Sequence, residues 1–258
     1  MRITLIGAGN LATHLGKALA DAGNTIEQVY SRTMLSATRL AALLGCEAQT
    51  EIGNVNTDSD VYVLSVSDSA LPQIVPQLCA GRDGGIFVHT AGSIPADIFR
   101  GHARHYGVVY PMQTFSKDAR LDFRKIPCFI EASDDGTLGV LQTMCREISD
   151  SVVPLGSDDR KYLHLAAVFA SNFVNHCYNV ASHIMRSHGI PFEYMYPLID
   201  EVASKIHSMP PYDAQTGPAV RNDRNVIDRH LSLLSDEPEF REIYGIMSDG
   251  IHKIRNKS

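Results

Sequence analysis

Two glycines and an alanine near the start of the chain have the spacing of a nucleotide-binding turn. Gly7, Gly9 and Ala12 form a G-x-G-x-x-A pattern in the stretch ITLIGAGNLATHLGKAL, with a strand-like run before it and a helix-like run after it. Gly7 allows a tight turn, and Gly9 lets the backbone approach a pyrophosphate. The free N–H groups at Asn10 and Leu11 would bind that anion, while Ala12 still allows close helix–strand packing. The pattern predicts a dinucleotide site; the alternative is a tight turn that binds no nucleotide.

The stretch IEQVYSRT, residues 26–33, decides between NAD and NADP. Glu27 has the spacing of an acid that binds the ribose of NAD, but it stands at the start of its strand, whereas ligands bind beyond the carboxyl ends of strands. Ser31, Arg32 and Thr33 stand at the carboxyl end. Hydroxyls and a guanidinium suit a 2′-phosphate, so the stretch favours NADP. The alternative interpretation of Arg32 is an arginine in a loop that is exposed to solvent and binds no cofactor.

Polar residues also follow the next strand-like run, VYVLSV. We expect Ser65, Val66 and Ser67 to contact the cofactor from this strand end. Ser67 has a second interpretation, because serine is also a preferred cap of the helix that follows.

Two further strand ends carry groups that could move a proton. In FVHTAGSIP, His89 and Ser93 lie together, and Pro95 is expected to open a helix. The alternative role of His89 is to hold the loop by hydrogen bonds. In GVVYPMQTF, Tyr110 and Gln113 are expected to line the same crevice, although YPM is also an ordinary strand-ending turn.

Polar residues in the C-terminal part are candidates for binding a substrate. Asn172, Asn175 and His176 have the spacing i, i+3, i+4 and so share one helix face. They would line a site or be satisfied inside a core or interface. Arg221, in TGPAVRND, could bind an anionic group or be an exposed arginine in a helix connection.

These residues need a parallel sheet to bring them together. Strand-like and helix-like runs alternate up to about Pro154, which predicts an α/β fold with a doubly wound Rossmann-type sheet. A single helical pattern then runs from a cap at Ser157 or Asp158 to a stop at Gly189, and only helical patterns follow. We therefore predict a Rossmann domain over residues 1–153 and an all-helical substrate and dimerisation domain over residues 154–258.

Composition excludes several other classes. The chain has 258 residues, 44% of them hydrophobic, and a formal net charge of −6, so we expect neither nucleic acid nor a membrane as partner. No signal peptide is visible, and none of the five cysteines forms C-x-x-C, so the expected location is cytoplasmic. No metal-ligand spacing, P-loop or G-x-S-x-G motif is present.

Taken together, SRT, HTAGS, YPMQTFS, HLAAVFASNFVNH and TGPAVRND make the chain resemble a family of bacterial NADP oxidoreductases. Members have a Rossmann-like N-terminal domain and a helical C-terminal domain of unknown function, similar in plan to pyrroline-5-carboxylate reductase and 6-phosphogluconate dehydrogenase. The resemblance implies an NADP cofactor, a C-terminal domain of the 6-phosphogluconate dehydrogenase type and a homodimer formed through the long helix. A deazaflavin as redox partner stays open.

The chain departs from better-understood relatives. It lacks the helical lysine of hydroxyacid dehydrogenases, and it carries Tyr110 where prephenate dehydrogenases have a histidine, although Ser93 is similar to their pattern. Our main hypothesis is an NADP-dependent oxidoreductase that reduces a small carbonyl or imine, with His89 and Ser93 moving the proton and Tyr110 as second candidate. The alternatives are a non-catalytic NADP(H)-binding sensor or scaffold protein and a Rossmann protein that binds no nucleotide.

Overall fold

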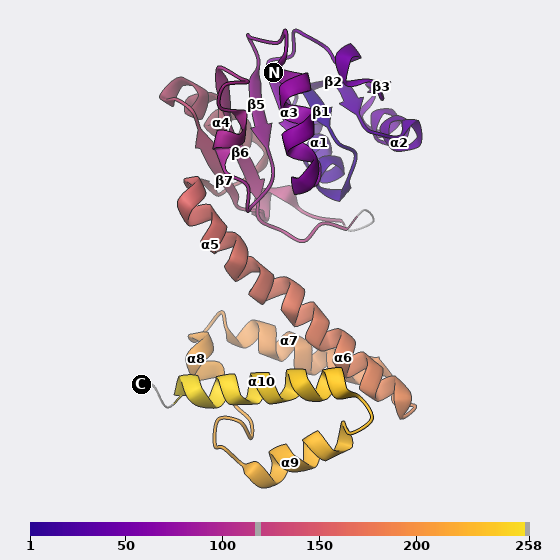
Figure 1. The fold of residues 1–258 in the computed structure, drawn as a ribbon, viewed down its shortest axis with the longest axis vertical. Helices are drawn as coiled ribbons and strands as arrows, with labels where there is room; N and C mark the ends of the chain where they lie inside the picture. The colour runs from indigo at the N-terminus through magenta and orange to yellow at the C-terminus, as the bar shows by residue number, and fades with distance from the viewer. Residues whose placement is uncertain (117–119, 256–258) are drawn as a thin grey trace. The chain divides into compact units, whose positions relative to one another are not determined.

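The computed structural model describes residues 1–116 and 120–255. By contacts the chain divides into two compact units, Met1–Asn172 and Phe173–Ser258 (Figure 1). The domain boundary at residue 153 stays a prediction.

Among its described residues, the first unit has one sheet of eight strands in the order β3-β2-β1-β4-β5-β6-β7-β8. All neighbouring strands are parallel except β6 and β7. The strands are β1 (Arg2–Ile6), β2 (Thr25–Tyr30), β3 (Glu47–Gln49), β4 (Val61–Leu64), β5 (Ile86–His89), β6 (His105–Pro111), β7 (Cys128–Ala132) and β8 (Val152–Pro154). The predicted α/β fold is confirmed. The sequence reading missed β3, because three residues at a sheet edge carry no apolar pattern.

Helices cover both faces of this sheet (Figure 1). One core packs α1 (Asn10–Asp21), α2 (Met34–Leu44) and α4 (Asp135–Ile148) against the sheet, and a second core packs α3 (Leu71–Cys79) against the other face. Alternate strand residues feed the two cores: Leu5 enters the first and Ile6 the second. The helix expected after Pro95 is only a 3₁₀ turn, Ala96–Phe99, which ends before Gly101 at a φ of +80°.

The long helix predicted after Pro154 is present. Helical backbone runs from α5 (Ser157–Ala167) through a π-helical segment, Val168–Phe173, into α6 (Val174–Ser187), and Gly189 at a φ of +68° follows its end. The predicted cap was wrong: Gly156 is the N-cap, because the Ser157 hydroxyl binds Glu131 instead. The π segment was not predicted, and such segments occur often at functional sites.

The second unit contains only helices and turns among its described residues. They are the rest of the long helix, a 3₁₀ turn (Phe192–Met195), α7 (Tyr196–Lys205), α8 (Pro211–Ala214), α9 (Arg224–Leu233) and α10 (Pro238–Arg255). Asp223 caps α9, as the sequence allowed. Among the described helices, none combines the length and apolarity that a membrane crossing requires.

Candidate active site

The turn after β1 requires glycine at its first position. Gly7 has a φ of +112°, and a Cβ added there would lie 2.3 Å from the carbonyl oxygen of Ser65. Its N–H donates to the Tyr30 carbonyl at 2.8 Å, and the Ser65 N–H donates to the Ile6 carbonyl at 2.8 Å. The turn is therefore fixed against the carboxyl ends of both neighbouring strands, β2 and β4, where residues 31–33 and 65–67 begin.

The start of α1 is open to an anion. Gly9 is the N-cap; among residues 1–116 and 120–255, no side chain caps this end, and a Cβ added to Gly9 would meet no atom within 4 Å. The first N–H groups of a helix have no intrahelical partner, so those of Asn10 and Leu11 are available to a phosphate. The side chain of Asn10 is engaged elsewhere, since its Nδ2 donates to the Phe115 carbonyl at 2.8 Å.

Close packing of α1 depends on Gly16 more than on Ala12. Ala12 is buried, but a Cβ added to Gly16 would lie 2.6 Å from Leu5 Cδ1 and 3.0 Å from Leu44 Cδ1. Gly16 thus lets the helix approach both β1 and α2. The sequence reading missed this residue, although a glycine one helical turn after Ala12 was a visible signal.

Residues 31–33 lie where the sequence placed them, at the carboxyl end of β2. The Ser31 N–H donates to the Gln49 carbonyl at 3.0 Å. Thr33 caps α2 and accepts from the Ser36 N–H at 3.4 Å. Arg32 is exposed and has no hydrogen bond or ion pair with any other residue in the described ranges. Its guanidinium is therefore available to a ligand.

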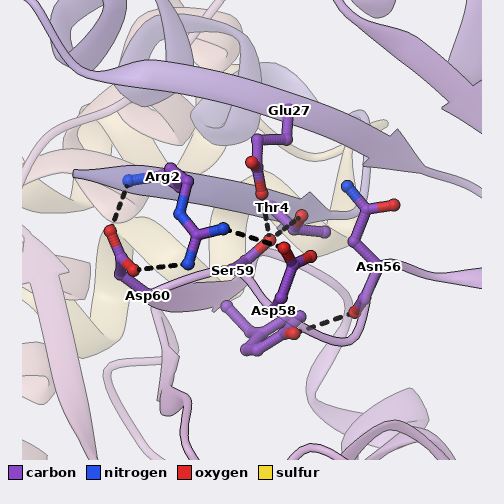
Figure 2. A network of polar contacts seen from close by, with 8 residues as sticks. Arg2, Thr4, Glu27, Asn56, Asp58, Ser59 and Asp60 are labelled. Carbon is purple, nitrogen blue, oxygen red and sulfur yellow. Dashed lines mark hydrogen bonds and ion pairs between the residues drawn. The ribbon is translucent and has the colours of Figure 1, made fainter.

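Glu27 lies near the start of β2, in the polar network that Figure 2 shows. It accepts a hydrogen bond from the Ser59 hydroxyl at 2.6 Å, and that hydroxyl is 2.8 Å from Thr4 Oγ1. Arg2 forms ion pairs with Asp58 and Asp60 in the same network. The interpretation that Glu27 begins its strand, away from the glycine turn, is confirmed.

Hydroxyl groups gather at the ends of β4 and β5. Thr90 donates to Ser65 Oγ at 3.3 Å, and Ser93 donates to Asp68 at 2.6 Å. Ser67 stands at the N-cap position of the following turn, but its side chain makes no capping hydrogen bond. The Ser67 hydroxyl is exposed and only 3.3 Å from that of Ser69.

His89 is enclosed by its own loop. The ring is fully buried, its Nδ1 accepts from the Ala91 N–H at 3.2 Å, and its Nε2 lies 3.3 Å from the Pro95 carbonyl. Burial lowers the pKa of His89 to about 4, so the ring is neutral near pH 7 and donates from Nε2 to that carbonyl. With both nitrogens bound, this geometry favours the loop-holding role over proton transfer to a substrate.

Tyr110 meets a residue that the sequence reading missed. Its hydroxyl lies 3.0 Å from Nδ1 of His164, which is on α5. Both residues line a cavity of about 580 Å³ together with Gln113 and Asn172. The His164 ring lies against Gly92, where an added Cβ would be 2.5 Å from Nδ1. The one sequence signal for His164 was a histidine on the long helix two turns before Asn172, on the same face.

A buried ion pair fixes the start of α5. Arg160 has a side chain only 1% exposed, and its guanidinium pairs with Glu131 of β7. It also donates to the Ile94 carbonyl at 2.6 Å and to Ser157 Oγ at 3.1 Å. Ser157 Oγ in turn accepts from the Ala96 N–H at 3.1 Å. These bonds connect the helix to both the sheet and the loop after β5.

The remaining substrate candidates belong to the second unit. Asn175, His176 and Arg221 are all exposed there, and Arg221 precedes Asn222, a residue with a φ of +52°. Their role in binding a substrate stays a prediction. In the described part of the chain, no three His, Cys, Asp or Glu residues are grouped to hold a metal ion.

Comparison with known proteins identifies the family. A Rossmann-like domain model matches residues 1–111, and a model described as a domain of unknown function, DUF2520, matches residues 126–251. The crystal structure of putative NADP oxidoreductase BF3122 from Bacteroides fragilis is 47% identical, covers 98% of each chain and has a TM-score of 0.95. The chain belongs to this Rossmann–DUF2520 family. The resemblance inferred from the motifs is confirmed.

Other solved structures share the fold of the Rossmann–DUF2520 family at low identity. An imine reductase from Myxococcus stipitatus in complex with NADP+ is 18% identical over 100% of this chain and 93% of that one, with a TM-score of 0.67. A 1-pyrroline-5-carboxylate reductase from Streptococcus pyogenes is 13% identical over 98% of each chain, also with a TM-score of 0.67. These two likenesses show the fold alone. None of the curated proteins is a significant match.

Proposed function

We propose that the protein is an NADP-dependent oxidoreductase that reduces a small carbonyl or imine. The observation that carries the proposal is the glycine turn with an unpaired arginine beside it. Only glycine fits at Gly7, and the carbonyl that accepts its N–H directly precedes the segment carrying Arg32. The name of the 47% identical relative, an NADP oxidoreductase, supports the same cofactor.

The residues present fit NADP. The open N–H groups of Asn10 and Leu11 would hold the pyrophosphate. Arg32, with the hydroxyls of Ser31 and Thr33, would hold the 2′-phosphate. The exposed Ser67, after Ser65 and Val66 at the end of β4, would contact the cofactor further along the crevice, as its position at a carboxyl strand end suggests. When bound, the cofactor supplies the hydride.

Titration with NADPH and NADH tests the proposal. We expect tighter binding of NADPH, because the 2′-phosphate gains a charge-assisted hydrogen bond worth about 1.5–3 kcal/mol. Arg32→Asp should weaken NADPH binding by roughly 10–100-fold and leave NADH binding much less affected. Arg229→Asp, which changes an exposed arginine of the second unit, is the matched control.

Three results would change the proposal. Equal affinities for NADPH and NADH would remove the role of Arg32, and binding of neither would favour a Rossmann protein without a nucleotide. NADPH binding without oxidation by any member of a panel of ketones, aldehydes and cyclic imines would favour the alternative, a non-catalytic NADP(H)-binding sensor or scaffold.

A further inference from the structure

His164 has one free ring nitrogen at the cavity. Its Nδ1 is bound to the Tyr110 hydroxyl at 3.0 Å, whereas Nε2 has no hydrogen-bond partner within residues 1–116 and 120–255. The two rings meet edge to face, with centroids 5.8 Å apart and an interplanar angle of 76°. Tyr110 is only 8% exposed, while His164 is half-buried, so of the pair His164 is the more accessible to a ligand.

We propose that His164 is the residue that transfers the proton during reduction and that Tyr110 positions it. This inference rests on the proposed reductase function. It departs from the expectation for His89, whose two nitrogens are both bound within its own loop.

The chemistry requires a group that can give one proton to the reduced atom. Bound NADPH would supply a hydride for a new C–H bond at the substrate carbon, and the π electrons would move to the carbonyl oxygen or imine nitrogen. That atom takes the proton from Nε2 of His164 in its imidazolium form, and the N–H bonding electrons stay on Nε2. NADPH would be oxidised to NADP+, and water would restore the proton to His164, because this residue is not fully buried.

Tyr110 decides which nitrogen of His164 exchanges the proton. Burial raises the pKa of Tyr110, so the phenol stays neutral over the working pH range. Its oxygen accepts from Nδ1–H in both charge states of the imidazole. The hydrogen bond from Nδ1 to Tyr110 fixes the tautomer of the His164 ring. Nε2 is then the nitrogen that gains and loses the proton.

The loop after β5 is shaped to receive the ring. A Cβ at Gly92 would lie 2.5 Å from Nδ1 and 3.0 Å from Cβ of His164, so any side chain there would displace the histidine. The buried His89 holds this loop through the Ala91 N–H, and Arg160, one helical turn before His164, holds the loop through the Ile94 carbonyl. The buried side chains of His89 and Arg160 therefore both help to fix the position of the His164 ring.

The cavity lining indicates which substrates to use in the test. Its described residues include no Lys, Arg, Asp or Glu, and they are mostly apolar: Met112, Phe115, Leu163, Ala166, Ala167, Val168 and Ala170. Tyr110, Gln113, Thr114, His164, Ser171 and Asn172 supply the polar groups. Because no fixed charge would pair with an ionised substrate here, neutral ketones and cyclic imines are the appropriate panel.

The experiment compares kcat, KM and NADPH affinity of the wild type with those of four variants on the best substrate of the panel. His164→Gln should lower kcat by about 10²–10⁴-fold and leave the NADPH Kd unchanged. Tyr110→Phe and Gly92→Ala should lower kcat less, since they misplace the ring without removing it. Gly139→Ala is the control, because a Cβ at this exposed helical glycine would meet nothing within 4 Å.

The pH profile separates proton transfer from a structural role. If His164 is the general acid, the wild-type kcat should fall as the pH rises, because the reaction consumes the protonated ring, and His164→Gln should abolish that fall. Tyr110 of β6 is the titratable group hydrogen-bonded to His164, and three others hold the loop and helix around it: His89 of β5, Arg160 of α5 and its partner Glu131 of β7. Tyr110→Phe should shift the profile, which a purely packing role would not do.

Each outcome decides a different claim. Unchanged turnover in His164→Gln, or an unchanged pH profile, would overturn the proton-transfer role and leave the reductase function intact. Absence of turnover by the wild type, with NADPH bound, would overturn the reductase function and this inference together. If His164→Gln has a lowered melting temperature, His164→Asn takes its place, and full activity in that variant is equally decisive against the proposal.

Discussion

At the scale of single residues, burial of the His89 ring makes stability depend on pH. The folded pKa is about 4, below the 6.5 of an exposed histidine, so between these values the unfolded chain binds a proton that the folded chain does not. The stabilising contribution is complete above pH 6.5 and is lost as the pH falls towards 4. The full loss is about 3 kcal/mol of unfolding free energy.

Urea unfolding at pH 7, 6 and 5 measures this effect. We expect His89→Gln to be less stable than the wild type at pH 7 and to lose less stability between pH 7 and pH 5, because its side chain takes up no proton. If the unfolding free energy changed equally with pH in the two proteins, the depressed pKa of His89 would be contradicted. The variant His102→Gln, which changes an exposed histidine, is the control and should keep the wild-type slope.

The sequence predicted where His89 lies but not its surroundings. A histidine at the end of a buried strand was visible, whereas the two bonds to Ala91 and Pro95 depend on how the following loop closes. Glu27 was placed correctly because strand direction alone decides which end of a sheet it occupies. His164 was missed because its partners, Tyr110 and Gly92, are 54 and about 70 residues away in the chain, and no local pattern encodes such contacts.

At the scale of elements, the position of α5 depends on the buried pair Arg160–Glu131. Removing one partner of a buried pair leaves an uncompensated charge or unpaired donors, which costs about 3–5 kcal/mol. Glu131 keeps 23% exposure, so we expect the lower end of that range for Arg160→Met. Chemical denaturation monitored by circular dichroism gives the value.

A double variant tests whether the charge pair or the packing of Arg160 matters. Adding Glu131→Leu to Arg160→Met replaces both charges by apolar groups, and such replacements are often neutral. We expect the double variant to recover part of the lost stability. Equal losses in the single and double variants would show that the bonds from Arg160 to Ile94 and Ser157 carry the effect instead.

Helices and strands with a strong apolar pattern were predictable, and interruptions were not. Helical spacing marked the whole stretch from Ser157 to Ser187, but the π segment Val168–Phe173 leaves no mark in that spacing. The cap at Ser157 was wrong for a similar reason. Serine is a good N-cap in isolation. Here, however, the Ser157 hydroxyl donates to Glu131 and accepts from Arg160, and these are tertiary contacts.

At the scale of the whole molecule, the second unit buries little apolar surface. Among its described residues, the buried hydrophobic side chains are Met185, Ala219 and Ile227. Exposed apolar residues are numerous by contrast: Ile184 of α6 is 38% exposed, and Leu198 and Val202 of α7 are each 58% exposed. Helices with so small a core are usually stabilised by a partner, and exposed apolar surface of this kind marks an interface.

We propose that the partner is a second copy of the chain, joined through the long helix with α7 contributing. Light scattering should then give twice the 28.3 kDa of one chain. Ile184→Glu should shift the mass towards one chain, because a symmetric interface would bury the new carboxylate twice. Asn179→Glu, at an exposed position about 140° around the same helix, should leave the dimer intact. A wild type with the mass of one chain would contradict the proposed dimer. Dissociation by both variants would contradict an interface confined to the Ile184 face of α6.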